Sequence, residues 1–318
     1  MINTHFISID WGTSNIRVRY IEIATLLIIE ETTSSNGIKT IHDAWMRHGG
    51  DRELYYATFL KSQINQFNSN IIAGTMIVIS GMASSSIGLR ELPYTNLPVE
   101  INGNTIYSET ITHSHFPYPI HLISGVKSED DVIRGEEIEL LGLIDKNDTQ
   151  GSTIFITPGT HSKHILVERN FITNFHTYMT GELFNILSNH SILKNAIHKS
   201  EFNHKNNASF SKGVLTSAEG NTMLNSLFKT RTNILFEKQT KEENYYYLSG
   251  LLIGEELSTL KHATYDTLKL CAGGNLFELY LEAIKTLNLF SKTKIISKET
   301  VDKAAVKGQW KTIKHLYV

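Results

Sequence analysis

The chain has 318 residues, of which 41% are hydrophobic and 19% charged, and its 30 Lys and Arg against 32 Asp and Glu leave a formal net charge of −2. This near-neutral balance excludes a broad electrostatic footprint for nucleic acid or for an anionic membrane. At roughly 100–200 residues per domain, the length predicts about two domains. We expect them over residues 1–148 and 149–318.

The cysteine content and the first residues indicate a cellular compartment. Cys271 is the single cysteine, which fits a reducing compartment. The opening residues, MINTHFISID, contain neither a basic region nor a long apolar stretch, so we expect no signal peptide and no membrane anchor. A cytoplasmic location follows as the expectation. Short apolar runs at 24–29 and 251–253 are read as pieces of the core.

In chain order, strand and helix patterns alternate. Residues 5–10 alternate apolar and polar side chains, and a WGTSN turn leads to a second run at 16–23, which predicts a β-hairpin. Further strands are expected at 75–80, 121–124, 152–157, 163–167, 268–272 and 294–296. Helices are expected at 135–144, 181–188, 214–228, 244–260, 276–287 and 298–311. We expect a surface loop at 203–211 and a hinge at 145–152. This alternation favours an α/β fold.

Two segments of the chain share one plan. FISIDWGTSNIRVRY and IFITPGTHSKHILV each contain an apolar strand, a tight turn with Gly-Thr and a returning strand. The second Gly-Thr pair, at 159–160, follows the first, at 12–13, by about half of the chain. The pattern indicates an ancient duplication with one hairpin in each half.

A Gly-Thr turn suits phosphate binding because glycine lets the backbone approach a ligand, and successive N–H groups form an anion-binding nest. The hydroxyls of Thr13 and Ser14 add donors. Asp10 is placed to hold Mg²⁺ through water, and Arg17 to neutralise charge or to support Asp10. An ordinary turn would use the same residue types, and one hairpin alone does not decide between the two interpretations.

Four motifs in order along the chain resemble a known family. D-x-G-T-S-N-x-R, R-G-E-E, P-G-T-H-S-K and M-T-G-E-L-F-N-I-L-S-N-H-S are similar to segments of 2-dehydro-3-deoxygalactonokinase, in the sugar kinase, Hsp70 and actin superfamily. The resemblance implies two ribonuclease-H-like, or actin-like ATPase, domains that flank a nucleotide-binding cleft. It also implies an enzyme that uses ATP and Mg²⁺ to phosphorylate the 6-hydroxyl of 2-dehydro-3-deoxygalactonate in sugar-acid catabolism. ATP and a small sugar acid would be the partners, and a homodimer is compatible with it.

The resemblance assigns phosphate and adenosine sites. It places the sugar acid and the first phosphate loop in the first domain, and the second loop and the adenosine in the second. The residues that match the phosphate loops are Asp10, Gly12, Thr13, Ser14, Asn15 and Arg17, and then Gly159, Thr160, His161, Ser162 and Lys163. The adenosine would lie at Gly273, Gly274 and Asn275. A strand-Gly-Gly-helix junction is also a plain turn.

The resemblance places a general base just after a glycine at the start of a helix. That position makes Glu136 the first choice, with Glu137 and Asp131 as alternatives. A helix N-terminus favours the ionised carboxylate that a base needs, although acidic residues in a first turn often only stabilise the helix.

A sugar acid carries a carboxylate, so its pocket should contain a cation and hydroxyl partners. The segment SGMASSSIGLRELPY follows a predicted strand and offers such groups. The candidates for substrate binding are Ser84, Ser85, Ser86, Arg90 and Arg134. A serine-rich segment is also common in turns.

Two other functions stay open at this point. The same cleft would serve a kinase for another sugar or sugar acid. A non-catalytic, ATP-dependent actin-like binding or sensor protein is the alternative outside the enzymes, and the divergent, lysine-rich end of the chain motivates it.

Overall fold

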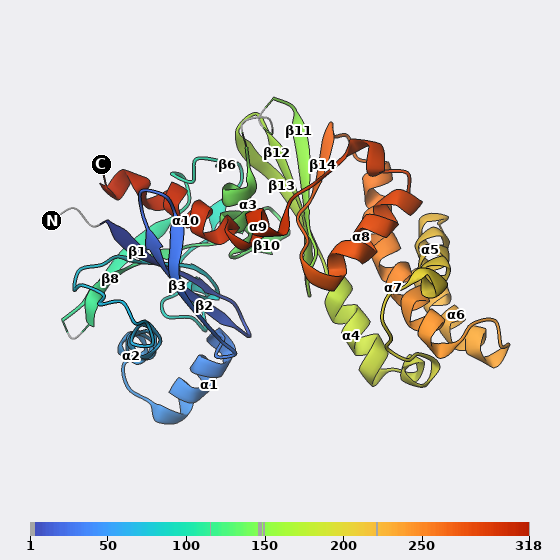
Figure 1. The fold of residues 1–318 in the computed structure, drawn as a ribbon, viewed down its shortest axis with the longest axis horizontal. Coiled ribbons are helices and arrows are strands. Elements are labelled where there is room, and N and C mark those ends of the chain that lie inside the picture. Colours follow the sequence, from blue (N-terminus) through green and yellow to red (C-terminus); the bar gives the residue numbers. More distant parts are fainter. Residues whose placement is uncertain (1–3, 115, 146–147, 149, 221, 318) are drawn as a thin grey trace. The chain divides into compact units, whose positions relative to one another are not determined.

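The computed structural model describes residues 4–114, 116–145, 148, 150–220 and 222–317. It divides into two compact units of mixed α/β structure (Figure 1). Unit 1 comprises Met1–Lys146, Asn170–Asn174 and Glu299–Val318, and unit 2 comprises Asn147–Arg169 and Phe175–Lys298. Among the described residues, no helix is both long and apolar enough to span a membrane.

The main sheet of unit 1 begins with the predicted hairpin. Its strands, in spatial order, are β3 (Leu27–Ser34), β2 (Ile16–Glu22), β1 (His5–Trp11), β4 (Ile77–Gly81), β8 (Phe116–Ile123) and β7 (Ser108–His113). β1 runs antiparallel to β2 and parallel to β4, which runs parallel to β8. A small second sheet contains β5 (Thr95–Asn96), β9 (Val126–Lys127) and β10 (Val132–Ile133), and β6 (Val99–Glu100) pairs with the start of β13 (Phe171–Tyr178).

Alternation along β1 separates the two faces of this sheet. Ile7, Ile9 and Trp11 are buried in one core with residues of α1 (Ile38–His48) and α2 (Arg52–Ile64). Phe6 points to the opposite face and stacks on Trp310 of α10 (Ala304–Ile313). Asp10 has the same parity as Phe6, and so lies on the face covered by α10 and α3 (Glu136–Leu143).

The last 20 residues correct the expected domain division. The described part of this segment packs in unit 1 and not with the second half of the chain, and α10 lies against α3 in Figure 1. The contact depends on glycine, because a Cβ at Gly142 or Gly308 would come within 1.9 Å of the opposite backbone. Gln309 then donates to the carbonyl of Ile9 at 2.8 Å and to the hydroxyl of Ser80 at 2.9 Å. The C-terminal helix thus supports the strands of the first hairpin.

Unit 2 repeats the topology of unit 1. Its strands, in spatial order, are the second half of β13 (Phe171–Tyr178), whose first half belongs to unit 1, then β12 (Ser162–Glu168), β11 (Ser152–Thr157), β14 (Thr267–Leu270) and β15 (Thr293–Ile295). As with β1, β2 and β4, the central β11 is antiparallel to β12 and parallel to β14, and β15 continues the sheet in parallel. The repeat supports the expected duplication and is consistent with two ribonuclease-H-like domains.

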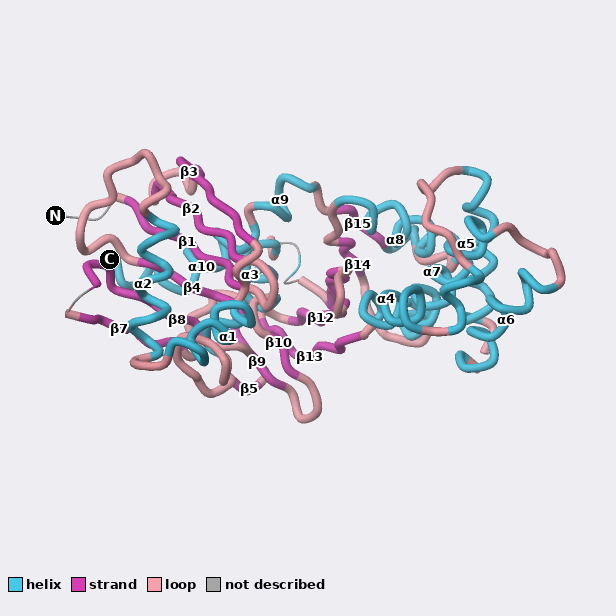
Figure 2. Tube along the Cα trace, turned by 90° about the horizontal axis from the view of Figure 1, so that it is seen from below, coloured by secondary structure: helices cyan, strands magenta, loops and turns pink. Residues whose placement is uncertain are grey.

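Helices complete unit 2. They are α4 (Thr180–His190), α5 (His204–Ala218), α6 (Met223–Leu235), α7 (Lys241–Ser258) and α8 (Gly274–Thr286), while α9 (Lys298–Asp302) leads back to unit 1. α5 and α7 lie side by side in Figures 1 and 2. Glycine permits this approach, since a Cβ at Gly213 would meet the Tyr247 carbonyl at 2.3 Å.

Three expectations from the sequence are wrong. Residues 203–211 are not a loop, because the Asn203 side chain accepts from the Lys205 amide and a capping box starts α5 there. The helix expected at 214–228 is two helices, separated near Gly220, whose φ of +79° ends α5. The run at 24–29 is a turn and an exposed edge strand, so Leu27 is 55% exposed. The patterns also did not reveal α1, α2, β3, β7 or β13, or the two-residue strands β5, β6, β9 and β10.

Candidate active site

The first phosphate loop, residues 12–15, is held by the start of α1. Within the loop, the Gly12 amide donates to the Asn15 carbonyl at 2.9 Å. Three consecutive amides, of residues 37–39, donate to the three carbonyls of residues 12–14 at 3.0 to 3.2 Å. The helix start thus holds the carbonyl side of the loop. This arrangement suits a turn whose amides serve a ligand.

Gly37 makes this contact possible through its lack of a side chain. Its φ of −65° and ψ of 173° are open to any residue, so no unusual backbone conformation demands glycine. A Cβ at this position would lie 2.3 Å from the Thr13 carbonyl oxygen. No sequence pattern had singled out Gly37.

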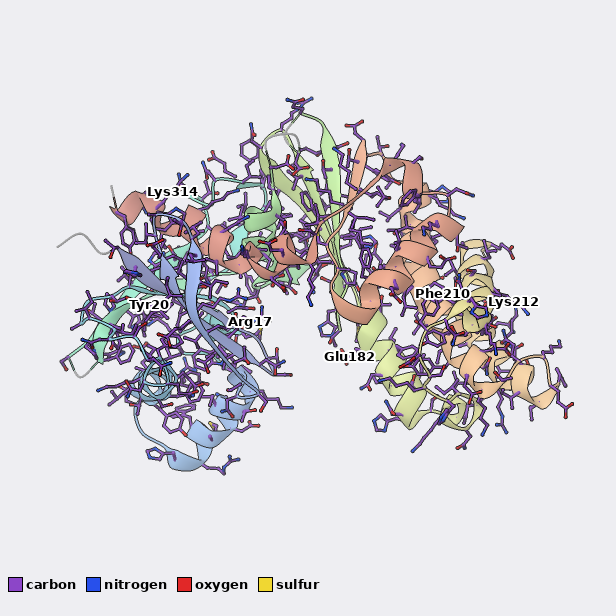
Figure 3. The ribbon with its side chains drawn as sticks, in the orientation of Figure 1. Arg17, Tyr20, Glu182, Phe210, Lys212 and Lys314 are labelled. Carbon is purple, nitrogen blue, oxygen red and sulfur yellow. The ribbon has the colours of Figure 1, made fainter. Side chains whose placement is uncertain are left out.

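Asp10 lies at the carboxyl end of β1, opposite Arg17 on β2 and beside Ser80 on β4. Burial raises the pKa of the Asp10 carboxyl, the charges of Arg17 and Arg19 lower it, and the charge of Glu136 raises it further. Figure 3 shows Arg17 at the end of the sheet that meets α1. Asp10 therefore belongs to a cluster of charges with the start of α3.

Glu139 is a member of this cluster that the sequence analysis missed. Burial, followed by the charges of Asp10 and Glu136, raises the pKa of the Glu139 carboxyl to about 8. Glu136 and Glu139 are three residues apart and so share one face of α3. That spacing in R-G-E-E-I-E was a signal available in the sequence.

The structure separates Glu136 from its nearest alternative. Glu137 is 1% exposed, and its two carboxylate oxygens accept from the Gly135 amide at 2.8 and 2.9 Å. Burial raises the pKa of Glu137 to about 8. Glu136 is partly exposed on the Asp10 side, and one of its oxygens accepts from the Arg134 amide at 3.1 Å. Asp131, the other alternative, accepts from the Val132 amide in a turn.

The structure does not favour Arg90 as a substrate ligand. Its guanidinium donates to both carboxylate oxygens of Glu53, at 2.6 and 2.9 Å, and to Glu109 at 3.0 Å. These hydrogen bonds raise the pKa of the Arg90 guanidinium well above its ordinary value. Two carboxylates already occupy this cation, so it is a poor partner for a third.

The three serines of the same segment differ in exposure. Ser84 and Ser85 are buried, and both hydroxyls donate to backbone carbonyls within the segment. Ser86 is exposed, and its carbonyl accepts from Arg52 at 2.9 Å. Ser84 and Ser85 therefore shape the turn, and Ser86 alone of the three presents an exposed side chain.

Arg134 is the better-placed cation of the two. It donates to the Ser84 carbonyl at 2.6 Å and to the Ser84 hydroxyl, and its guanidinium lies 4.2 Å from the centre of the Tyr94 ring. Its Nε is buried and has no hydrogen-bond partner among the described residues. Ser84 and Tyr94 thus fix the orientation of the guanidinium.

The second phosphate loop, residues 158–161, is held by the start of α4. The Glu182 amide donates to the Thr160 carbonyl at 3.0 Å, and the Glu182 carboxylate pairs with the His161 ring. Figure 3 labels Glu182 at the N-terminal end of α4. Lys163 is 4% exposed and donates to the His161 carbonyl at 2.9 Å. Lys163 thus supports the loop backbone.

A cavity of about 730 Å³ opens beside this loop, within unit 2. Gly159 and Gly181 line it. Aromatic and aliphatic side chains from α4, α7 and α8, together with Phe202, form much of its wall, and other lining side chains, such as Lys199, Glu201 and Glu278, are charged. The lining residues include Phe202, Tyr245, Tyr246, Leu276, Leu279 and Tyr280. None of these six was predicted as a site residue from the sequence, although consecutive tyrosines at 245–247 were a visible signal.

The predicted adenosine residues lie at the start of α8. Gly273 and Gly274 are exposed, Gly274 has a φ of +60°, and a Cβ on either would meet nothing within 4 Å. The cavity borders the following residues of α8. The side chain of Asn275 lies outside the described part of the chain.

Known proteins match nearly the whole chain. The model of the family described as 2-keto-3-deoxy-galactonokinase matches residues 10–311. The chain belongs to this kinase family. The match begins at Asp10 and extends over both phosphate loops and most of α10. It confirms the resemblance drawn from the motifs.

Curated relatives and a solved structure agree with the kinase family. The chain is 28% identical over 295 residues to a Rhizobium meliloti protein named a probable 2-dehydro-3-deoxygalactonokinase, covering 90% of both chains. It is 27% identical over 293 residues to the 2-dehydro-3-deoxygalactonokinase of Escherichia coli, covering 90% of this chain and 91% of that one. A crystal structure from Sinorhizobium meliloti, also described as a 2-dehydro-3-deoxygalactonokinase, matches with a TM-score of 0.83 at 26% identity. The match covers 98% of this chain and 96% of that one.

The donor set of this family member suits a hydrated divalent cation. Among the described residues, no three His, Cys, Asp or Glu side chains gather as a complete metal site. Burial chiefly raises the pKa of Asp10 and of Glu139; the charge of Glu136 raises both further, and the charge of Asp10 also raises the pKa of Glu139. Mg²⁺ keeps most of its water and needs one or two carboxylates, so these residues fit it.

Proposed function

We propose that this kinase transfers the γ-phosphate of ATP to the 6-hydroxyl of 2-dehydro-3-deoxygalactonate, giving the 6-phosphate and ADP. The family match and the relatives' names support the substrate. The observation that carries the proposal is the cavity of about 730 Å³ that is continuous with Gly159 of the second phosphate loop. An aromatic-walled space beside a phosphate loop suits a nucleoside triphosphate.

The adenosine would enter the cavity, and the phosphates would meet the second loop. Flat apolar walls from Phe202 and Tyr245 suit a base, while the nearby polar groups suit a ribose. The exposed Gly273 and Gly274 leave open space for a ligand beside α8. The amides of both loops would neutralise phosphate charge without reorganisation, because the helix starts already hold their backbones.

Glu136 would act as the general base for the 6-hydroxyl. Phosphoryl transfer needs a carboxylate near the acceptor oxygen together with charge neutralisation. Arg134 would bind the carboxylate of the sugar acid, since Ser84 and Tyr94 orient its guanidinium. Ser86 would contribute a hydroxyl contact. Asp10, with Glu139 nearby, would hold Mg²⁺ through water, and the ion supplies charge neutralisation at the phosphates.

The decisive experiment is a substrate panel. Purified protein with ATP and Mg²⁺ is incubated with 2-keto-3-deoxy sugar acids, hexoses and amino sugars, and ADP release is measured. We expect release that depends on 2-dehydro-3-deoxygalactonate, with the phosphate on the 6-oxygen by NMR. Release with another acceptor would reassign the substrate, and no release above background with any acceptor would overturn the kinase assignment for this chain.

A variant tests the role of Glu136. Glu136→Gln should leave nucleotide binding intact and lower kcat by about 10²-fold or more, in line with general-base contributions. An unchanged kcat would move the role to Asp131. We also propose that the protein is cytoplasmic and forms a homodimer. Cell fractionation tests the location, and analytical sedimentation tests the homodimer.

A further inference from the structure

We propose that Glu256 is a positioning residue for the second phosphate loop, acting through Tyr280 and Thr180. The proposal rests on the proposed function, because it gives that loop the task of holding ATP phosphates. Glu256 lies in the last turn of α7, is 2% exposed and touches none of the loop residues in the described hydrogen bonds. It is one of the buried charged groups that the mechanism above does not use.

Three donors from three elements converge on the Glu256 carboxylate. Tyr280 of α8 donates to Oε2 at 2.6 Å, and the Thr180 hydroxyl at the start of α4 donates to the same oxygen. The His164 ring of β12 lies 3.0 Å from Oε1 through Nε2. A buried carboxylate requires such compensation, so Glu256 fixes the relative positions of these elements.

A directed chain of hydrogen bonds runs from the loop to this carboxylate. The Gly159 amide donates to the Ser162 hydroxyl at 3.4 Å, and the Ser162 and Tyr280 hydroxyls lie 2.8 Å apart. Because Tyr280 donates its proton to Glu256, its oxygen accepts from Ser162. The four side chains of this hydrogen-bonded network are buried, so water does not compete with them; they are Ser162, Tyr280, Glu256 and Thr180.

Thr180 connects the same carboxylate to the loop by a second route. The next residue, Gly181, lies so close to the loop that a Cβ would be 2.5 Å from the Gly159 carbonyl oxygen. The amide that follows donates to the Thr160 carbonyl at 3.0 Å. A shift of Thr180 therefore moves the carbonyl side of the loop.

Glu256 thereby aligns the loop with the cavity beside it. Tyr280, Thr180, Gly181 and Gly159 all line that cavity. The buried network thus holds the loop that would contact phosphates at the edge of the cavity that would hold the adenosine. The residue contacts no part of the expected ligand and acts only through its partners.

Substitutions at Tyr280 and Thr180 test the inference. Tyr280→Phe keeps the ring in the cavity wall but removes the bridge, and Thr180→Val removes the second donor while Thr180→Ser keeps it. Hydrogen bonds to a buried charge contribute enough that we expect about 10-fold weaker ATP binding for each loss. The Kd of adenosine, which has no phosphate, should stay at the wild-type value, and Thr180→Ser should restore ATP binding.

Tyr56→Phe is the matched control. Tyr56 is also buried, and its hydroxyl donates to the Ile87 carbonyl at 2.7 Å in unit 1. Melting temperature, calorimetric Kd values for ATP and adenosine, and both KM values are measured for all variants. We expect the control to lose stability without losing ATP affinity.

The outcomes separate this inference from the proposed function. Wild-type protein that does not bind ATP would refute the proposed function itself. ATP binding by wild type that Tyr280→Phe and Thr180→Val leave unchanged would overturn the positioning role alone. A parallel weakening of ATP and adenosine binding would also overturn it, because the network would then shape the cavity wall and not the loop.

Discussion

Replacing Gly37 with alanine tests how the first phosphate loop is positioned. A Cβ at Gly37 would lie 2.3 Å from the Thr13 carbonyl oxygen and 2.4 Å from the carbonyl carbons of Thr13 and Ser14. All three atoms are backbone, so no side-chain rotation relieves the contact. To reach an ordinary distance of 3.4 Å, the loop and the start of α1 must separate by about 1 Å.

Such a separation breaks the three hydrogen bonds that residues 37–39 donate to the loop. Overpacking of this kind typically costs about 1–3 kcal/mol. A misplacement of about 1 Å at a reacting centre can cost about 10²-fold in rate. We therefore expect Gly37→Ala to lower kcat/KM for ATP by 10- to 100-fold, order of magnitude, with a modest fall in melting temperature.

Gly74→Ala is the control for a general loss of stability. Gly74 has a φ of +87° and open space around it, so alanine there strains the backbone without displacing the loop. Steady-state kinetics with varied ATP, and thermal melting, are compared for wild type and both variants. If Gly37→Ala kept the kcat/KM of wild type and of Gly74→Ala, the loop would tolerate the displacement and the argument from close contact would be refuted.

Three further predictions concern charge. Arg134→Ala should raise the KM for the sugar acid about 10-fold or more. Arg90→Ala should lower only the melting temperature, because Glu53 and Glu109 already pair with Arg90. A raised KM for Arg90→Ala with an unchanged KM for Arg134→Ala would exchange their roles. Burial lowers the pKa of His121 to about 4, so His121 stabilises the fold above pH 6.5, and this contribution, at most about 3 kcal/mol, is lost as the pH falls toward 4. Melting temperatures of wild type and His121→Gln, measured from pH 8 to pH 4, should converge at low pH. The glutamates of α3, with raised pKa values, stabilise the fold in the opposite direction, but both proteins contain them, so the comparison isolates the histidine. Parallel curves would contradict the prediction. Lys269→Met should destabilise unit 2 by about 3–5 kcal/mol in chemical denaturation, because it removes the ammonium that lies 2.7 Å from the carboxylate of Asp148, which is 3% exposed; an equal loss in the double variant with Asp148→Leu would show that the ion pair is not the cause.

The sequence by itself determined the two hairpins and the family. A strand, a Gly-Thr turn and a returning strand are local patterns, so both hairpins formed where their residues predicted them. Ordered motifs depend only on the order of residues, and the family match confirmed what they indicated. Helix ends were harder, because the capping of Asn203 and the positive φ of Gly220 decide between loop and helix within a few residues.

The tertiary structure decided which charges are available. Arg90 and Arg134 look equivalent in the sequence, but two glutamates from distant segments pair with Arg90 while a serine and a tyrosine orient Arg134. Glu136 and Glu137 are neighbours, yet the helix start turns one toward Asp10 and buries the other against its own backbone.

It also decided what lies beneath each phosphate loop. Gly37 and Gly181 are far apart in the sequence and carry no motif of their own that predicts a contact with the loops. A Cβ would lie 2.3 Å from a loop carbonyl oxygen at Gly37 and 2.5 Å from one at Gly181. The absence of a side chain therefore lets each helix start contact its loop. The last helix likewise returned to unit 1, because two glycines let α10 meet α3. Such close approaches depend on the absence of atoms, and only the folded backbone shows which glycines they require.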